Sequence, residues 1–161
     1  MSKQLGHQGV DGRIVFGDNL DFLRTLPPGS VDLIYIDPPF NTGKTQVRRR
    51  LKTMRDDLAP DRIGFQGKGY RTELIGSQRF DDTFSDFRAF ILPRLDEAHR
   101  VLKDTGSFFL HLDYREVHYA KVVLDALFGR ENFLNEIIWA YDYGGKSNSR
   151  WPAKHDTILV Y

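Results

Sequence analysis

The chain has 161 residues, of which 40% are apolar and 28% charged, so it can bury the core of one domain and is too ordinary in composition for a disordered or fibrous protein. The absence of cysteine excludes disulfide frameworks, thiolate zinc sites and thiol nucleophiles. The net charge of +1 conceals an asymmetry, because residues 44–79 hold ten Lys or Arg against four Asp or Glu. Such a segment favours a local contact with a polyanion, with a solvated basic loop as the alternative.

No apolar run approaches the roughly 18 residues that a membrane span needs, and the N-terminus has no apolar signal core. We therefore expect a soluble cytoplasmic protein that does not contact a membrane.

The N-terminal residues predict a strand, a helix and a second strand. A β-like run at 13–16 ends in Gly17, after which Asp18 or Asn19 can cap a short helix. Residues 31–36 are dense in β-forming side chains and predict a buried strand. This order of elements is the unit of a parallel α/β sheet.

Residues 41–80 show no sustained periodicity and predict a basic, irregular insertion, which inside a compact domain is usually functional or disordered. Regular structure resumes with a possible capping box at Thr83 and Asp86. The alternation that follows predicts a doubly wound α/β domain. Its expected elements are a helix to Leu102 that Pro93 should kink, a strand at 107–112, a helix from Asp113 or Glu116 to Gly129, and strands at 134–141 and 157–161.

The segment Asp37-Pro38-Pro39-Phe40 lies where the 31–36 strand ends, and open α/β sheets bind ligands at the carboxyl ends of their strands. Because proline has no N–H, the segment offers a carboxylate and bare carbonyls, followed by an aromatic ring. Asp37 and the Pro38 carbonyl can each accept one N–H of an exocyclic amine while Phe40 stacks on the heterocycle. Base–aromatic stacking is worth roughly 1–3 kcal/mol, comparable with the cost of extruding a base.

The run GDNLDFLRTLPPGSVDLIYIDPPFNTGK resembles the start of the DNA amino-methyltransferases of restriction–modification systems, specifically the adenine N6 type in which the tetrapeptide comes early. The similarity continues through RLDEAHRVLKDTGSFFLHLD, ENFLNEIIWAY and KHDTILVY. It implies a Rossmann-like, S-adenosylmethionine-dependent methyltransferase fold, of which residues 1–161 would be the N-terminal and incomplete part.

The resemblance also implies roles for individual residues. Asp37, Pro38, Pro39 and Phe40 would form the catalytic segment that holds a flipped adenine, and residues 107–113 could line the same pocket. Asp18 and Asn19 would contact the cofactor, although Asp18 can equally be an ordinary helix cap. The basic residues after the tetrapeptide would contact DNA phosphates, which position DNA without reading its sequence. These residues are Lys44, Arg48, Arg49, Arg50 and Lys52.

One feature departs from this family. Its glycine-rich cofactor motif, Phe-x-Gly-x-Gly, does not occur in these 161 residues. We therefore expect the isolated chain to bind S-adenosylmethionine poorly and to be inactive, and we expect the complete enzyme to have DNA, a restriction or modification subunit, or a second copy as partners. The alternatives are a catalytically inactive remnant that binds DNA or a partner, and the same chemistry on RNA or a protein amide.

Two other motifs do not match the functional sites that they resemble. Gly43-Lys44-Thr45 is not a phosphate-binding loop, because position 38 is proline where that motif requires glycine. His111, Asp113 and His118 match no standard spacing of metal ligands, and local capping explains Asp113 better. No metal is expected.

Overall fold

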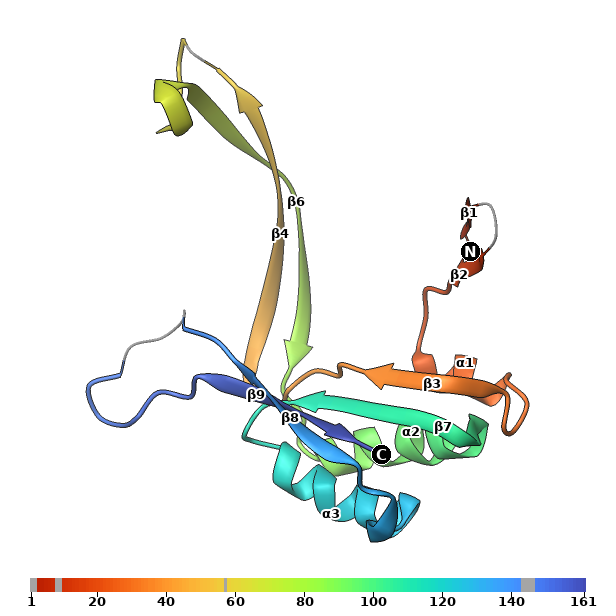
Figure 1. The fold of residues 1–161 in the computed structure, drawn as a ribbon. Coiled ribbons are helices and arrows are strands. Elements are labelled where there is room, and N and C mark those ends of the chain that lie inside the picture. The colour runs from red at the N-terminus through yellow and green to blue at the C-terminus, as the bar shows by residue number, and fades with distance from the viewer. Residues whose placement is uncertain (1–2, 8–9, 57, 143–146) are drawn as a thin grey trace. The chain divides into compact units, whose positions relative to one another are not determined.

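The computed structural model describes residues 3–7, 10–56, 58–142 and 147–161 (Figure 1). The chain divides into two compact units. The larger unit comprises Met1–Asn41 and Phe84–Tyr161, and the smaller one comprises Thr42–Thr83. The larger unit is a mixed α/β structure and the smaller unit is all β. Within the described residues, no helix is both long and apolar enough to cross a membrane.

The larger unit is built on a four-stranded sheet of order β3-β7-β9-β8. β3 (Val31–Ile36) and β7 (Leu102–Leu112) are parallel, whereas β9 (His155–Val160) is antiparallel to β7 and to β8 (Asn135–Ala140). The sequence predicted all four strands, because each contains a short run rich in β-branched and aromatic residues, but β7 begins at Leu102, five residues before its predicted start.

Two helices cover one face of this sheet. α2 (Phe87–Val101) and α3 (Val117–Phe128) turn their apolar sides toward Phe108, Leu110 and Leu112 of β7, all fully buried. The α2 helix begins at Asp86, whose carboxylate accepts a hydrogen bond from the Ala89 N–H, so Asp86 and not Thr83 is the cap. A short 3₁₀ turn, η2 (Arg130–Asn132), follows α3 and Gly129.

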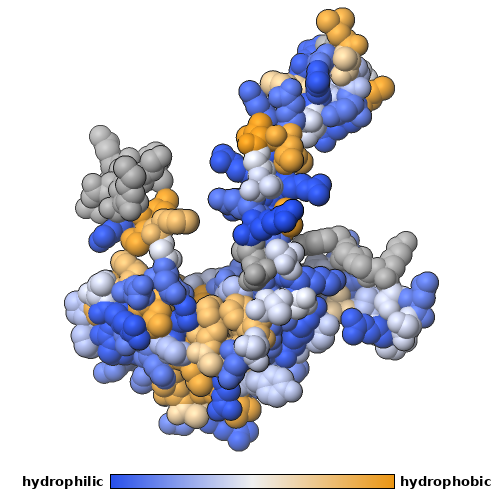
Figure 2. All heavy atoms as spheres, turned by 180° about the vertical axis from the view of Figure 1, so that it is seen from behind, coloured by the Kyte–Doolittle hydropathy of each residue, from blue (hydrophilic) through white to orange (hydrophobic). Residues whose placement is uncertain are grey.

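The opposite face of the sheet is largely open. Tyr35 on β3 and Trp139 on β8 are 50% and 58% exposed, and Figure 2 shows apolar residues at the surface of this unit. The sequence predicted a doubly wound sheet, but in the described part of the chain α2 and α3 both pack on the same face. Residues that alternate along β3 and β7 therefore point either into the core or toward the open face.

The first predicted strand is wrong in its bounds and its partner. β1 (Lys3–His7) and β2 (Val10–Ile14) form an antiparallel pair of their own, separate from the main sheet. The short helix α1 (Asn19–Arg24) follows and is capped by Asp18. The Arg100 guanidinium donates to the carbonyls of Leu23 and Leu26, which ties the end of this helix to α2.

The smaller unit corrects the prediction that residues 41–80 are irregular. β4 (Lys44–Arg55) pairs antiparallel with β6 (Gly69–Asp82) over twelve residue pairs, from Lys44 opposite Asp82 to Arg55 opposite Tyr70. β5 (Arg62–Ile63) and the 3₁₀ turn η1 (Phe65–Gly67) lie between them. Polar and charged side chains occupy both faces of this ribbon, so no apolar alternation marks it in the sequence.

Candidate active site

The segment Asp37–Phe40 follows directly after β3, at the carboxyl end of the parallel strand pair. The Asp37 side chain is 59% exposed, and Phe40 is half-buried against the core of the larger unit. The carboxylate is thus open to a ligand while the ring is anchored. This is the placement that the sequence predicted for the tetrapeptide.

A cavity of about 390 Å³ brings three of the four predicted catalytic residues together with both predicted cofactor residues, and Phe40 is not among its lining residues. Asp37, Pro38 and Pro39 line it from the end of β3, and Asp18 and Asn19 line it from the start of α1. Phe90, Ile91 and Arg94 of α2 complete it, with Gly17, Tyr35 and Ile36. Two segments almost twenty residues apart in sequence therefore share one pocket of a size suited to a small molecule.

Asp18 is both a helix cap and half of an ion pair. Its carboxylate accepts from the Leu20 N–H at 2.9 Å and from Nη2 of Arg94 at 2.9 Å and 3.0 Å. The Leu20 hydrogen bond, with the positive charges of Arg94 and Arg24, lowers the pKa of Asp18 below its ordinary value. The capping interpretation is confirmed, and it does not compete with a place in the cavity wall.

Arg94 is a site residue that sequence reasoning missed. Its Nε donates to the Asn19 side-chain oxygen at 2.9 Å, its Nη1 donates to the Phe90 carbonyl, and its guanidinium lies 3.9 Å from the centre of the Phe90 ring. The arginine thus fixes both predicted cofactor residues against α2. No signal in the sequence points to it, since its acidic partner is 76 residues away.

Asn41 holds the far end of the catalytic segment. It adopts a left-handed backbone conformation, with φ of 56°, which asparagine tolerates better than most residues. Its Nδ2 donates to Oε1 of Glu116 at 2.7 Å, and its Oδ1 accepts from the Phe84 N–H at 3.0 Å. The segment is therefore fastened both to the start of α3 and to the point where the chain re-enters the larger unit.

His111 lies on the open face of the sheet beside the catalytic segment. Its Nδ1 is 3.0 Å from the Tyr35 hydroxyl and 3.8 Å from Oδ1 of Asp37, and its Nε2 is 3.7 Å from Oδ2 of Asp156. The Phe40 ring centre is 5.5 Å from that of the imidazole. Burial, and then the charge of Asp37, raise the pKa of Tyr35 above its ordinary value.

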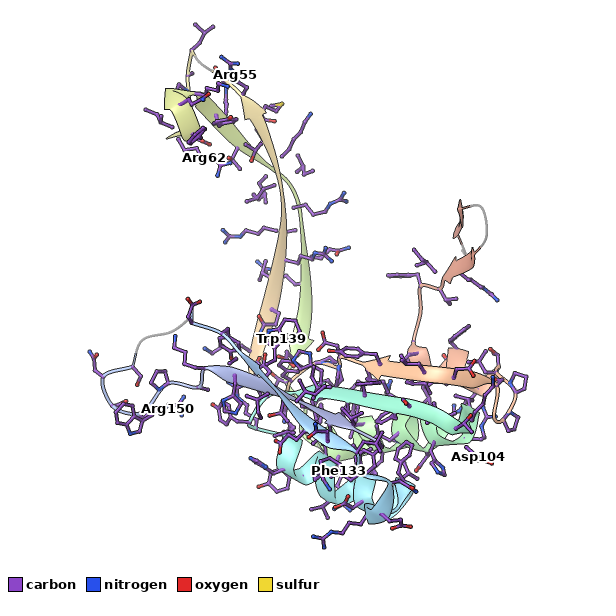
Figure 3. All side chains as sticks on the ribbon, viewed as in Figure 1. Arg55, Arg62, Asp104, Phe133, Trp139 and Arg150 are labelled. Carbon is purple, nitrogen blue, oxygen red and sulfur yellow. The ribbon has the colours of Figure 1, made fainter. Side chains whose placement is uncertain are left out.

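The predicted DNA-binding residues all lie on β4 in the smaller unit and are exposed. Figure 3 shows side chains pointing outward along both sides of this ribbon, with Arg55 and Arg62 toward its far end. Because side chains alternate along a strand, Arg49 lies on the opposite face from its two arginine neighbours. The face that carries most of the basic residues of β4 contains Lys44, Arg48, Arg50 and Lys52.

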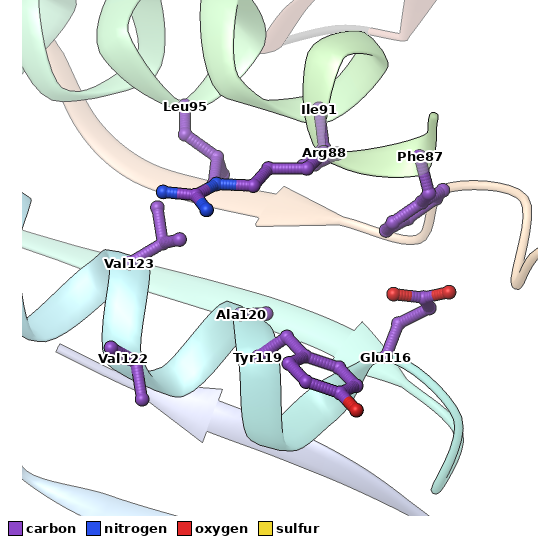
Figure 4. Close-up of a pocket in the computed structure, with 9 residues that line it drawn as sticks. All are labelled: Phe87, Arg88, Ile91, Leu95, Glu116, Tyr119, Ala120, Val122 and Val123. Carbon is purple, nitrogen blue, oxygen red and sulfur yellow. The ribbon is translucent and has the colours of Figure 1, made fainter. Parts of the chain in front are cut away.

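A second cavity of about 300 Å³ lies between α2 and α3 (Figure 4). Phe87, Ile91 and Leu95 line one side, and Ala120 and Val123 are among the residues that line the other. Arg88 and Glu116 are its charged groups, and the Glu116 carboxylate already accepts from Asn41. This lining suits an apolar group better than a charged cofactor.

Comparison with known proteins identifies the family of this chain. The sequence model of the DNA methylase family matches residues 31–161. The Type II methyltransferase M.KpnI of Klebsiella pneumoniae is 32% identical over 152 residues, which cover 92% of this chain and 31% of that protein. The StyLTI Mod subunit, from a Type III restriction-modification enzyme of Salmonella typhimurium, is 34% identical over 76% of this chain and 19% of its own length.

The DNA adenine methyltransferase YhdJ of Escherichia coli is 28% identical over 91% of this chain and 40% of its own length. The chain thus spans less than half the length of each of these relatives. The family match begins at β3, whose carboxyl end carries Asp37, and includes every strand and helix of the larger unit from there onward. The chain belongs to the DNA methylase family.

Proposed function

We propose that this chain forms the target-amine side of a site-specific DNA methyltransferase, which transfers a methyl group from S-adenosylmethionine to the N6 amine of adenine in DNA. The observation that carries the proposal is the shared cavity, in which Asp37 and the two prolines face Asp18 and Asn19. The adenine N6 assignment is supported by the Asp form of the tetrapeptide and by the name of the YhdJ relative. The mixed sheet would then be part of a Rossmann-like methyltransferase fold.

The exposed Asp37 carboxylate and the Pro38 carbonyl would each accept one N–H of the extruded adenine, while the half-buried Phe40 ring stacks on the base. These two hydrogen bonds turn the nitrogen lone pair out of conjugation and toward the cofactor side of the cavity. The nitrogen would form a bond to the methyl carbon as the carbon–sulfur bond breaks with its electron pair staying on sulfur, and the amine would lose one proton to water. The contribution of the protein is orientation and electrostatics.

The residues of the cavity fit the proposed cofactor. S-adenosylmethionine carries an ammonium and a carboxylate on its methionine part, and it would supply an electrophilic methyl group when bound. Asp18 and Arg94 offer one charge of each sign in the same cavity wall, and the Phe90 ring lies beside them. Asp18 and Asn19 would hold the cofactor there, and Arg94 would keep both in place.

Basic residues of the smaller unit are proposed to contact DNA. Lys44, Arg48, Arg49, Arg50 and Lys52 lie exposed on a ribbon of two long strands, and a two-stranded ribbon can enter the major groove of a duplex. Since several relatives are named Mod subunits of restriction-modification enzymes, a restriction subunit is a second proposed partner. The third proposed partner is another copy of the same chain.

The test is methyl transfer to duplex DNA by the longest protein that contains this chain, with N6-methyladenine measured by mass spectrometry. We expect Asp37→Ala to lower the rate at least 100-fold, because the group that orients the amine is lost. The exposed Asp21→Ala, on the outside of α1, is the matched control and should leave the rate unchanged. Equal rates for Asp37→Ala and the unchanged protein, or transfer to RNA in preference to DNA, would refute the proposal.

The same methyl-transfer experiment is also carried out with residues 1–161 alone. We expect them to bind S-adenosylmethionine weakly, because the printed sequence lacks the glycine-rich motif. Robust transfer by these residues alone would contradict that expectation and leave the assignment of the reaction intact.

A further inference from the structure

The imidazole of His111 stands at the centre of a polar cluster on the open sheet face. Tyr35 lies on β3, and Asp37 follows directly after that strand. Asp156 reaches the imidazole from β9, and Trp139 reaches it from β8. Tyr35 and Asp37 share a face with His111, because Tyr35 pairs with Phe109 across the parallel strands. The Asp156 carboxylate also accepts from the Tyr141 hydroxyl at 3.4 Å. Among the described residues, the titratable groups that face the imidazole are Tyr35, Asp37 and Asp156.

The two ring nitrogens have different partners. Nδ1 is within hydrogen-bonding distance of the Tyr35 hydroxyl, at 3.0 Å. Nε2 is buried and has no hydrogen-bond partner among the described residues, yet it lies 3.7 Å from an oxygen of Asp156. A buried polar atom without a partner is costly, so a small movement that brings Nε2–H onto the carboxylate is favoured. A proton on Nε2 leaves Nδ1 of the neutral ring as an acceptor.

This arrangement decides where the Tyr35 hydroxyl donates. Nδ1 lies 3.0 Å from the hydroxyl, and Oδ1 of Asp37 lies 3.8 Å from the same Nδ1, so the carboxylate is a second acceptor in the neighbourhood of the hydroxyl. Among the described residues, no hydrogen bond to the Asp37 carboxylate is found. With Nδ1 as acceptor, Tyr35 is engaged and Asp37 keeps its oxygens for a ligand.

We propose that His111 is a positioning residue: oriented by Asp156, it accepts the Tyr35 hydroxyl proton on Nδ1 and so keeps the Asp37 carboxylate free to receive the amine of the target base. The last part rests on the function proposed above, whereas the hydrogen-bond arrangement stands by itself. The contact between the imidazole and the Phe40 ring would be kept by any planar ring of similar size. Replacement by phenylalanine therefore isolates the role of the two nitrogens.

The first measurement is independent of activity. In ¹⁵N NMR of residues 1–161, the neutral His111 ring is expected to carry its proton on Nε2, and Asp156→Asn is expected to weaken that preference. A proton on Nδ1 of the neutral ring would overturn the proposal whatever the enzyme methylates. Because Asp37 is not altered in this measurement, its result says nothing for or against the proposed reaction.

The second measurement is a double-mutant cycle on methyl transfer. His111→Phe is expected to lower kcat about tenfold, because the released Tyr35 hydroxyl turns to Asp37. Tyr35→Phe alone is the reference corner of the cycle, and adding His111→Phe to it should cost little further kcat, so that the double variant is faster than His111→Phe alone. Rescue by removing a hydroxyl is not expected if His111 only packs against its neighbours.

Controls separate this result from misfolding and from failure of the proposed function. His118→Phe alters an exposed histidine of α3 and should leave kcat unchanged. Thermal unfolding of each variant is measured alongside. If His111→Phe lowers kcat and the double variant is equally slow, the positioning role is wrong. The proposed reaction fails instead if Asp37→Ala is as fast as the unchanged protein or if RNA is methylated in preference to DNA.

Discussion

Asp18 shows how one side chain can stabilise the fold and form the wall of a functional cavity. Its carboxylate caps α1 through the Leu20 N–H and pairs with Arg94 of α2. Both interactions favour the charged form, so the pKa of Asp18 is lowered from its usual 3.8. A carboxyl group with a lowered pKa in the folded state stabilises the protein above its unfolded pKa, and this stabilisation is lost as the pH falls through the folded value.

We therefore predict that Asp18→Asn lowers the thermal unfolding midpoint near neutral pH, and that the difference from the unchanged protein shrinks as the pH falls below about 4. Asparagine is also a good helix cap, so the change removes mainly the ion pair with Arg94. Asp21→Asn in the same helix is the control, with a smaller difference at neutral pH. A difference for Asp18→Asn that persists unchanged at pH 2 would contradict this account.

Single residues differ in how far the sequence reveals them. Asp37 could be predicted because its chemistry is carried by consecutive residues, a carboxylate followed by two prolines and a ring. Arg94 could not be predicted, and for His111 the resemblance pointed only to the range 107–113, because each residue depends on a contact with a side chain 76 residues away. Neither has a local pattern that distinguishes it from any other arginine in a helix or histidine in a strand.

At the scale of elements, α2, α3 and β7 of the larger unit were predictable because each of them buries one side. α2 shows buried residues at helical spacing, and β7 alternates between core and open face at its carboxyl end. The β4–β6 ribbon was missed because few of its side chains are buried, and its register is set by backbone pairing and not by an apolar face. The sequence does reveal the positive charge of the ribbon.

Side chains alternate between the two faces of β4, and this alternation predicts which arginines contact DNA. The sequence alone does not give that prediction, because it did not reveal the strand. Arg48 and Arg50 point to the same face of the ribbon as Lys52, whereas Arg49 points to the other, beside Val47 and Leu51. The bulge between the strands lies in β6, where Ile75 is inserted opposite the 50–51 step, so the alternation of β4 continues through it. A duplex that contacts the more basic face would meet two of the three arginines.

We predict that Arg48→Ala and Arg50→Ala each weaken duplex binding and lower the salt slope of log K by about 0.9, while Arg49→Ala changes the slope much less. The measurement is fluorescence anisotropy of a labelled duplex from about 50 to 200 mM salt. Arg49 is a matched control, since it has the same side chain on the same strand. Equal loss for all three arginines would show that the faces are not distinguished, and an unchanged slope for the triple variant would remove this ribbon from the DNA interface.

At the scale of the whole molecule, the chain leaves the larger unit and returns to it at two residues that lie side by side. Asn41 and Phe84 are joined by a hydrogen bond of 3.0 Å, although 42 residues separate them in sequence. The buried core consists of residues of the larger unit, including Phe108, Leu110 and Leu124. The smaller unit closes on itself, because Thr42 donates through its hydroxyl and N–H to the Asp82 carboxylate.

We therefore predict that residues 42–83 can be replaced by roughly two or three glycines, a span that the adjacent ends allow, without unfolding the larger unit. The shortened protein should keep its thermal unfolding midpoint within a few degrees, because no core residue is removed. It should lose most of its affinity for duplex DNA, because the six basic residues of β4 go with the ribbon.

The reciprocal peptide, residues 42–83, should be largely unfolded by circular dichroism, since an isolated ribbon without an apolar face is marginal in water. A shortened protein that fails to fold would mean that the ribbon is needed for folding of the larger unit, and one that binds DNA with undiminished salt dependence would place the phosphate contacts elsewhere.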